Sequence, residues 1–390
     1  MPVLMAAFLF NLGQGVLRPS MPLYLQRAFA ANYTMVTLIP VVFGSGKWIA
    51  NVPTGYALRR LGRSLMICGL ALIAVVDVAT VATSNYQRFL GLRAVAGVGW
   101  AMFATVATTA MVSGATAERR GRAVSLFLIS ETLGLLLGSA VGGWLYASVG
   151  LVSPFLFEAC CMIVAVAVVA RWAAVSTGGL PSPPQSRDRG LLRSALRTPP
   201  VALMGVTSAV LVAIQTGVLV FLFPLFLVER AGVGPEAVGF LVSLGVLGRL
   251  LALWFGGTLS DRWGRLRVLV PGLLLFAVVL GGMPGLTQPT LIGAASFAIG
   301  AAAGFVAGIP TALAGDQVGP ALQGVTVGWI RTMSDSGQIV GPLLIGALAD
   351  AFGVSAPFLV GGALLAATAW QCHRRARVMA VPVPARDPAS

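Results

Sequence analysis

A nine-residue pattern occurs twice in this chain, and it constrains the fold more than any other feature of the sequence. Residues 55–63 read GYALRRLGR, and residues 257–265 read GTLSDRWGR. The offset is 257 − 55 = 202 residues, and the same offset maps Lys47 onto Arg249. An offset of 203 residues maps Gly138 onto Gly341. Two halves of equal length, repeated in parallel, predict two similar bundles with a site between them, which is the architecture of a transporter.

The composition places this duplicated chain in a membrane. Of its 390 residues 57% are hydrophobic and only 10% are charged, and the mean hydropathy is +0.90. A soluble protein carries about 25% charged residues. The apolar runs are each about 20 residues long, which is the length of a helix that crosses the hydrocarbon core. Because backbone groups in lipid must be hydrogen-bonded internally, these runs predict helices and an all-α polytopic membrane protein.

The apolar runs divide the chain into twelve predicted transmembrane helices, arranged as two pseudo-symmetric six-helix bundles. We expect an N-terminal bundle at 1–172, a cytoplasmic linker rich in Pro, Ser and Arg at 173–199, a C-terminal bundle at 200–372 and a cytoplasmic tail at 373–390. The predicted spans are 2–26, 34–57, 65–84, 87–112, 123–148, 152–172, 200–228, 236–258, 267–283, 289–314, 322–349 and 354–372.

The basic residues predict the orientation in the membrane. The formal net charge is +14, and Lys47 is the only lysine. With the N-terminus inside, most arginines fall in the segments on the inner side, as the positive-inside rule requires. This distribution accounts for the charge without a nucleic-acid partner. We therefore predict a multi-pass protein of the cell (inner) membrane with both termini in the cytoplasm, whose first apolar segment is a retained helix rather than a cleaved signal.

The sequence argues against an enzyme and against a metal or cofactor. Its four cysteines have no metal-ligand spacing, and its single histidine, His373, lies next to the tail. No convergent set of nucleophile, base and metal ligands is visible, as an enzyme would need. A membrane sensor would need an appended soluble domain, and the tail after His373 is too short for one.

Three motifs now point to a family. The pattern at the second copy resembles the loop signature of the major facilitator superfamily, and the first copy lies at the equivalent loop between the second and third spans. On the fourth span, Arg93 with Gly97 and Gly99 resembles the embedded-arginine motif of proton-coupled members. On the fifth span, the glycines from Gly134 to Gly143 resemble the antiporter motif. The signature residues are Gly257, Asp261, Arg262, Gly264, Arg265, and in the first copy Gly55, Arg60, Gly62, Arg63.

This resemblance covers nearly the whole chain and implies a twelve-helix transporter that works by alternating access, similar to the drug:proton antiporters. Two positions depart from the family pattern. Arg59 stands where the pattern has Asp, and Ser139 stands where the family usually has Pro. In the family that Asp faces a helix N-terminus and helps to latch the inner gate, where a carboxylate is favoured by the helix dipole and an arginine is not. We therefore expect the latch at the second copy, around Asp261. The glycine pairs either allow close helix packing alone or also take part in gating.

Charged residues inside the predicted spans are the candidates for gating and proton coupling, because a buried charge in lipid is costly and usually functional. Depth along the helices suggests that Lys47 pairs with Asp335 and that Arg249 pairs with Glu131, as two bridges between the bundles. Arg331 lies one turn before Asp335. These pairs either titrate during transport or are static structural pairs. For Arg93, coupling and packing remain alternatives. The acids Asp77 and Glu158, on peripheral spans, are expected to have structural or interfacial roles.

By the same resemblance, the first, fourth, seventh and tenth spans should line the substrate cavity. Arg18 either reaches this cavity or extends toward the membrane surface. No carboxylate lies in the middle of these four spans, which predicts a neutral or anionic amphipathic substrate rather than a multivalent cation. The expected lining residues are Asn11, Gln14, Arg18, Arg93, Trp100, Phe103, Gln215, Thr216 and Phe305.

Three functions remain open at this point. The first is a proton antiporter that exports small hydrophobic compounds, the second is uptake or exchange of an organic anion or other metabolite through Arg18 and Arg93, and the third is a non-transporting membrane protein. We favour the first. The expected partners are a small-molecule substrate, protons and the lipid bilayer, and the protein is expected to be a monomer without cofactors.

Overall fold

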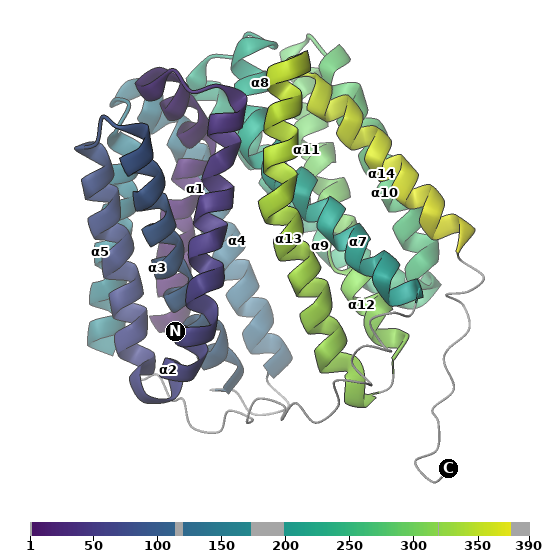
Figure 1. Cartoon of the computed structure of the whole chain (residues 1–390), viewed down its shortest axis with the longest axis horizontal. Helices are drawn as coiled ribbons and strands as arrows, with labels where there is room; N and C mark the ends of the chain where they lie inside the picture. Colours follow the sequence, from purple (N-terminus) through teal and green to yellow (C-terminus); the bar gives the residue numbers. More distant parts are fainter. Residues whose placement is uncertain (1, 114–119, 173–198, 319, 376–390) are drawn as a thin grey trace. The chain divides into compact units, whose positions relative to one another are not determined.

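The computed structural model describes residues 2–113, 120–172, 199–318 and 320–375, and these residues form helices and short connections, with no strand among them (Figure 1). The predicted linker at 173–199 lies almost wholly outside the described residues, as does most of the tail. The first half of the chain contains α1 (Pro2–Phe29), α2 (Tyr33–Val81), α3 (Tyr86–Ser113), α4 (Arg120–Ser148) and α5 (Ser153–Trp172).

The second half of the chain is divided into more elements. They are α7 (Pro199–Ala213), the π-helix η2 (Ile214–Leu222), α8 (Phe223–Glu229), α9 (Pro235–Trp263), α10 (Arg265–Gly282), the 3-10 turn η3 (Met283–Gly285), α11 (Pro289–Val306), α12 (Ile309–Asp316), α13 (Pro320–Phe352) and α14 (Ala356–Arg374).

All twelve predicted spans fall on helix, with ends that differ by a few residues. The seventh span is built from α7, η2 and α8 in sequence, and the tenth from α11 and α12. Within the described residues, eight helical segments are long and apolar enough to cross a membrane, judged by length and composition. The predicted all-helical fold is therefore confirmed.

The junction between the second and third predicted spans differs from the expected loop, because α2 is helical throughout. A straight helix would place Lys47 and Gly69 about 33 Å apart at 1.5 Å per residue. Both nevertheless pack on neighbouring residues of α3. A Cβ on Gly97 would lie 3.2 Å from the backbone nitrogen of Lys47, and a Cβ on Gly99 would lie 2.7 Å from the carbonyl oxygen of Gly69. The helix therefore folds back on itself, and its two legs correspond to the two predicted spans (Figure 1).

The second copy of the motif also forms helix rather than a loop. Helix α9 continues to Trp263, α10 begins at Arg265, and only Gly264 interrupts them. Gly264 has φ 95° and ψ 133°, a conformation that glycine adopts without the steric cost a side chain would impose. One residue with this freedom is enough to end one span and begin the next.

The described chain divides into two compact units. Unit 1 contains the described residues within 1–182 and 220–246, and unit 2 contains the described residues within 183–219 and 247–390. In unit 1, α2 packs along α3, α1 packs against α4, and α5 packs against α1 and α2. In unit 2, α10 packs against α14 and α11, and α13 packs against α7.

This division differs from the predicted bundles by residues 220–246, which join unit 1. Their contacts explain the assignment. The Glu229 carboxylate at the end of α8 accepts hydrogen bonds from Gln26 of α1 and Tyr33 of α2. A Cβ on Gly239 of α9 would lie 2.7 Å from the Gly143 nitrogen of α4, so these two backbones touch directly.

Each unit contains the same close helix contacts, at positions related by the sequence repeat. In unit 1 a Cβ on Gly46 would lie 2.0 Å from the Ala94 carbonyl oxygen, and in unit 2 a Cβ on Gly248 would lie 2.2 Å from the Phe297 carbonyl oxygen. Gly248 is Gly46 shifted by 202 residues, and Phe297 is Ala94 shifted by 203. Only glycine allows such backbone approach, which is how helices associate in lipid. The duplication read from the sequence is therefore repeated in the packing.

The antiporter-type glycines make a second matched contact. A Cβ on Gly138 of α4 would lie 2.1 Å from the Leu12 carbonyl oxygen of α1, and a Cβ on Gly341 of α13 would lie 2.2 Å from the Ala213 side chain at the end of α7. In the sequence repeat, Ser139 is the equivalent of Pro342, which lies inside α13. Ser139 instead keeps α4 regular and donates its hydroxyl to the Leu135 carbonyl at 2.8 Å.

Candidate functional site

A buried ion pair lies inside unit 1, between the third and fourth predicted spans. The Arg93 guanidinium of α3 donates to the Asp77 carboxylate of α2 at 2.9 Å and to the Thr80 hydroxyl at 2.8 Å. Asp77 and Thr80 are fully buried, and Arg93 is 3% exposed. Asp77 and Thr80 are three residues apart, so they lie on the same face of their helix and present two oxygens to one guanidinium.

A second carboxyl group joins this ion pair from α5. Glu158 is fully buried, accepts a hydrogen bond from the Gln14 amide of α1, and lies close enough to Asp77 for the two side chains to interact. Four helical segments, from α1, α2, α3 and α5, therefore contribute to one polar group, which we call the Arg93 cluster and define as Gln14, Asp77, Thr80, Arg93 and Glu158.

Aromatic rings and a few titratable groups surround the Arg93 cluster. The Arg93 guanidinium lies 5.5 Å from the ring centre of Phe89 and 5.4 Å from that of Phe155, which are cation–π distances. Tyr24 of α1 is the nearby phenol, and Cys161 lies one turn after Glu158 on α5. These neighbours exclude bulk water, so the charges must be compensated within the cluster.

The structure changes the interpretation of the buried acids. We expected Asp77 and Glu158 to have structural or interfacial roles on peripheral spans. The interfacial alternative is wrong, because both side chains are fully buried and bond within unit 1, whereas the structural alternative agrees with these contacts. Gln14, expected in the substrate cavity, instead donates to Glu158. Arg93 was expected to contribute to coupling and to the cavity. Its guanidinium bonds to both Asp77 and Thr80, and the side chain is almost inaccessible to solvent.

Other predicted residues of unit 1 come together in pairs. Glu131 of α4 has Asn11 of α1 as a side-chain hydrogen-bonding neighbour, and Asn11 also donates to the Ala7 carbonyl at 3.0 Å. The Lys47 ammonium lies 4.0 Å from the centre of the Trp100 ring. Lys47 and Glu131 were expected to act in gating, and Asn11 and Trp100 to line the cavity. Each of the two pairs therefore joins a predicted gating residue to a predicted cavity residue.

Phe103 is not a cavity-lining residue. It is 1% exposed and stacks on Phe10 with ring centres 4.4 Å apart, inside the apolar core of α1, α2, α3 and α5. The expectation was wrong because a helix in a bundle has a buried side as well as a cavity side, and hydropathy does not distinguish them. Arg18 is half-buried in α1 and makes contacts of its own.

In unit 2 the predicted residues are more dispersed. Gln215 and Thr216 lie in the π-helix η2, a wider helical form that often occurs at functional sites. Phe305 packs its ring toward Gly272 of α10, at 3.0 Å from a Cβ built there. Arg249 is half-buried at the close contact between α9 and Gly304.

The remaining charged candidates of unit 2 do not pair with each other. Arg331 is exposed and Asp335 is half-buried, one helical turn apart on α13. No ion pair joins them in the part of the chain that the structure describes.

The residues of the loop signature form specific contacts in each unit. In unit 2, Arg265 lies 3.3 Å from the Asp261 carboxylate and donates to the Asp316 carboxylate at the end of α12. In unit 1, Arg63 donates to the Ala170 carbonyl near the end of α5, where helix carbonyls lack partners. Arg262 is exposed and Gly62 is buried. The exposure of Gly55 and Arg60 lies outside what the structure describes.

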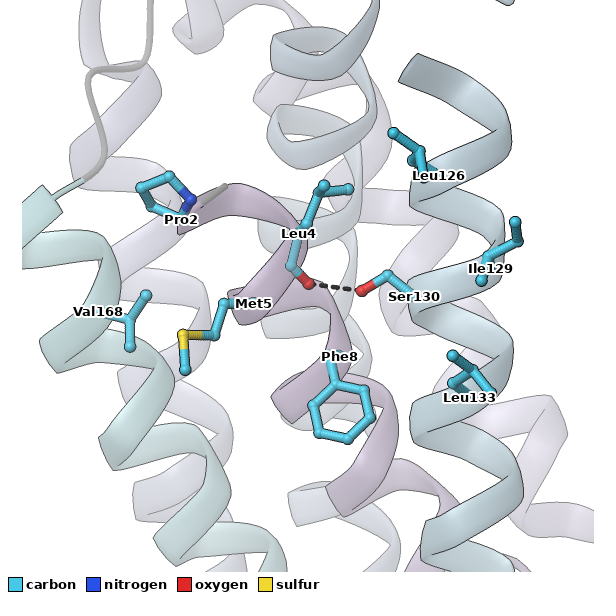
Figure 2. A pocket seen from close by; sticks show the side chains of 9 residues that line it. All are labelled: Pro2, Leu4, Met5, Phe8, Leu126, Ile129, Ser130, Leu133 and Val168. Atoms are coloured by element: carbon cyan, nitrogen blue, oxygen red, sulfur yellow. Dashed lines mark hydrogen bonds between the residues drawn. The ribbon is translucent and has the colours of Figure 1, made fainter. Parts of the chain in front are cut away.

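A pocket of about 720 Å³ lies in unit 1 between α1, α4 and α5. Figure 2 shows side chains of α1 and α4 on opposite sides of it, with Val168 of α5 nearby. The polar side chain in its lining is Ser130, which donates to the Leu4 carbonyl at 2.6 Å. None of the predicted cavity residues lines this pocket, whose apolar walls suit an alkyl chain or an aromatic ring.

The sequence contains a signal for the Arg93 cluster. An acid within a transmembrane segment indicates a functional site by default, and its partner should be sought among the other charged residues. Asp77, Arg93 and Glu158 all lie within the predicted spans. Their convergence depends on how four helical segments are rotated about their axes, which hydropathy alone does not specify.

Comparisons with known proteins agree with this architecture. The model of the Major Facilitator Superfamily matches residues 3–235 and 205–388. The uncharacterized MFS-type transporter YcaD of Salmonella dublin is 28% identical over 308 residues, covering 77% of this chain and 76% of the relative. YcaD of Escherichia fergusonii is 29% identical over the same length and coverage.

Solved structures share the fold at low sequence identity. The nucleoside transporter NupG has a TM-score of 0.79 at 12% identity and covers 96% of this chain and 98% of its own. A bacterial homolog of the human lysosomal transporter Spinster, in an inward-facing and unoccupied conformation, has a TM-score of 0.77 at 14% identity, with 98% of each chain covered. These similarities concern the fold.

Proposed function

This chain belongs to the Major Facilitator Superfamily, and on that premise we propose that it is a proton-coupled transporter that exports small neutral or anionic amphipathic compounds by alternating access. The observation that carries the proposal is the Arg93 cluster, with two fully buried carboxyl groups beside one guanidinium inside a membrane-spanning unit. Buried ionisable groups of this kind mark proton pathways in membrane proteins. A second protonatable group, Glu131, lies on α4 beside Asn11.

Export rather than uptake is supported by the resemblance of the glycines on α4 to the antiporter motif. Its glycines Gly134 and Gly138 touch the backbone of α1 at Phe8 and Leu12, with distances of 2.4 and 2.1 Å for a built Cβ. Such a surface without side chains lets the two helices approach closely. The pocket between α1, α4 and α5 offers apolar walls near the same contact.

The second candidate is uptake or exchange of an organic anion, which would use Arg18 and Arg93 as cationic partners. The geometry around Arg93 argues against Arg93 as a binding partner of the anion. Its guanidinium already binds Asp77 and Thr80 and is 3% exposed. An anion would have to displace a buried carboxylate, so Arg18 alone would carry the recognition.

We further propose that Lys47 with Asp335 and Arg249 with Glu131 form exchangeable ion pairs during the transport cycle, and that Asp261, Arg262 and Arg265 contribute to the inner gate. Both termini are proposed to lie in the cytoplasm and the protein to act as a monomer in the cell (inner) membrane. Labelling of single cysteines placed at residues 2, 186 and 385 in intact cells and in everted vesicles tests the orientation. Labelling of these positions from opposite sides of the membrane would contradict it.

The decisive experiment measures flux in proteoliposomes of defined orientation. We would use chloramphenicol as a neutral amphipathic probe and 1-naphthalenesulfonate as an anion that cannot itself carry protons. An acidic medium on the outer side of the protein should accelerate movement of at least one probe from the inner to the outer side, and a protonophore should abolish the acceleration. If neither probe responds to the pH gradient, proton-coupled export is wrong.

The same preparation separates the two candidate functions. Anion recognition through Arg18 predicts that Arg18→Gln weakens the thermal stabilisation by 1-naphthalenesulfonate and that Arg18→Lys retains most of it. It also predicts no stabilisation by chloramphenicol. Stabilisation by chloramphenicol that survives Arg18→Gln favours export of neutral compounds.

A further inference from the structure

The Arg93 cluster contains more negative than positive charge. Asp77 and Glu158 are each fully buried, and Arg93 is the cation that bonds to the cluster. With both carboxyls ionised, the three groups carry a net charge of −1 in an environment without bulk water. Two buried carboxyl groups that share a site do not ionise together, because the like charges repel and neither is hydrated.

The hydrogen-bond pattern shows where a compensating group belongs. One oxygen of each carboxyl is used: Asp77 Oδ1 accepts from Arg93, and Glu158 Oε1 accepts from Gln14. The other oxygens, Asp77 Oδ2 and Glu158 Oε2, are buried and lack partners among the described residues. Both are acceptors when ionised, so they cannot satisfy each other, and leaving them unpaired is costly.

The carboxyl groups of Asp77 and Glu158 lie close enough for their side chains to interact. A single proton between them converts one oxygen into a donor and leaves the other as its acceptor, which satisfies both atoms at once. The same proton changes the net charge of the three groups from −1 to 0. Around these three groups, α1 contributes Gln14 and the phenol of Tyr24, and α5 contributes the thiol of Cys161.

We propose that Asp77 and Glu158 together form a single-proton binding site inside unit 1, with Arg93 balancing the remaining carboxylate, and that this site binds the proton that is coupled to transport. Gln14 positions Glu158, and Thr80 positions Arg93. The proton comes from water and returns to water, and no covalent bond other than O–H forms or breaks. The first part of the proposal stands on the geometry alone, and the second part rests on the proposed proton-coupled function.

Infrared spectroscopy tests the proton site on the purified full-length protein, because a protonated carboxylic acid has a C=O stretch that a carboxylate lacks. Wild-type protein at neutral pH should show such a band from a buried acid that exchanges slowly with heavy water. Glu158→Gln and Asp77→Asn should each remove it, because the single remaining carboxylate is balanced by Arg93. Glu236→Gln, an exposed acid at the start of α9, is the matched control and should leave the band unchanged.

Thermal unfolding of each variant establishes that it is folded, and the isosteric substitutions Asp→Asn and Glu→Gln keep the shape of the site. The proton site is overturned if wild-type protein lacks the band, or if the band persists in both Glu158→Gln and Asp77→Asn. Should one variant fail to fold, the other still decides the question.

The coupling is tested with 1-naphthalenesulfonate and chloramphenicol in proteoliposomes, as the ratio of flux with and without a pH gradient. For a probe that responds in wild-type protein, the ratio should fall to about one in Glu158→Gln and stay at the wild-type value in Glu236→Gln. An unchanged ratio in both Glu158→Gln and Asp77→Asn overturns the assignment of the coupled proton. If wild-type protein itself shows no response, proton coupling is wrong, whereas the infrared result still decides whether the site binds a proton.

Discussion

The guanidinium of Arg93 lies 2.9 Å from the carboxylate of Asp77, and both side chains are shielded from solvent inside unit 1. The two residues are 16 positions apart, on opposite sides of the connection between α2 and α3. An ion pair in this position joins two consecutive spans, and its two side chains are almost inaccessible to water. The packing of α2 against α3 therefore depends on the charges of Asp77 and Arg93.

Removing the cation should destabilise the fold. We expect Arg93→Leu to lower the free energy of unfolding by about 3–5 kcal/mol, because it leaves a buried carboxylate without its partner. Asp77→Asn should cost less, since Glu158 can still balance Arg93. Thermal unfolding in detergent measures both effects. The control is Arg88→Leu, an exposed position on the same helix, which should stay within about 0.5 kcal/mol. Equal losses at positions 88 and 93 would contradict this account.

The matched glycine contacts should respond alike in the two units. Gly46→Ala and Gly248→Ala place a Cβ 2.0 and 2.2 Å from the backbone oxygens of Ala94 and Phe297, so the helices must separate. We expect each change to cost about 1–3 kcal/mol, as overpacking does. Gly91→Ala, where a Cβ meets no atom within 4 Å, should instead be neutral or stabilise by up to about 1 kcal/mol.

Thermal unfolding of these three variants ranks the costs directly. A loss at Gly46 without a loss at Gly248 would show that the close contact is needed in one unit only. Such a result would contradict the view that the repeated packing follows from the repeated sequence.

The junction between α9 and α10 should depend on Gly264. Alanine at this position must either adopt the positive φ of 95° or straighten the chain, at a cost of about 1–3 kcal/mol. Gly257→Ala, seven residues earlier in α9, has open space for its Cβ and should be neutral or slightly stabilising. Gly264→Ala tests backbone strain at a positive φ, whereas Gly257→Ala tests only the loss of a flexible glycine within a helix. Thermal unfolding of both variants in the same detergent makes the comparison.

The charged residues of the second motif copy should affect transport more than stability. The side chains of Asp261 and Asp316 are 66% and 51% exposed, so each ion pair with Arg265 should contribute less than about 1 kcal/mol. Because the two carboxylates share one guanidinium, Asp261→Asn and Asp316→Asn should each lower probe flux by less than Arg265→Gln does. Proteoliposome flux measures this order. Wild-type flux in Arg265→Gln would exclude this contact from the gate.

Much of the fold follows from local rules. The apolar runs placed all twelve spans to within a few residues, because in lipid each backbone must satisfy its own hydrogen bonds and the length of a span is set by the membrane. The motif copies were less well predicted. We expected loops at Gly55–Arg63 and Gly257–Arg265, but helix continues through the first and is interrupted in the second by Gly264 alone. Polar residues mark the end of a span without specifying whether the helix ends there.

The site was predicted only in part. The sequence identified every member of the Arg93 cluster except Thr80 as a polar residue in a span, and it placed Arg93 among the functional candidates. It assigned Gln14 to the cavity and the two acids to structural or interfacial roles on peripheral spans. Gln14 and Glu158 are 144 residues apart, and nothing in the spacing of either indicates that they meet.

The amino-acid sequence by itself determined that this protein is a duplicated bundle of membrane-spanning helices, because span length and internal repetition are properties read along one dimension. The tertiary structure decided which buried charges are partners. That choice depends on the rotation of each helix about its axis and on close backbone contacts at glycines, where no Cβ would fit, and these are set by packing among segments far apart in the chain.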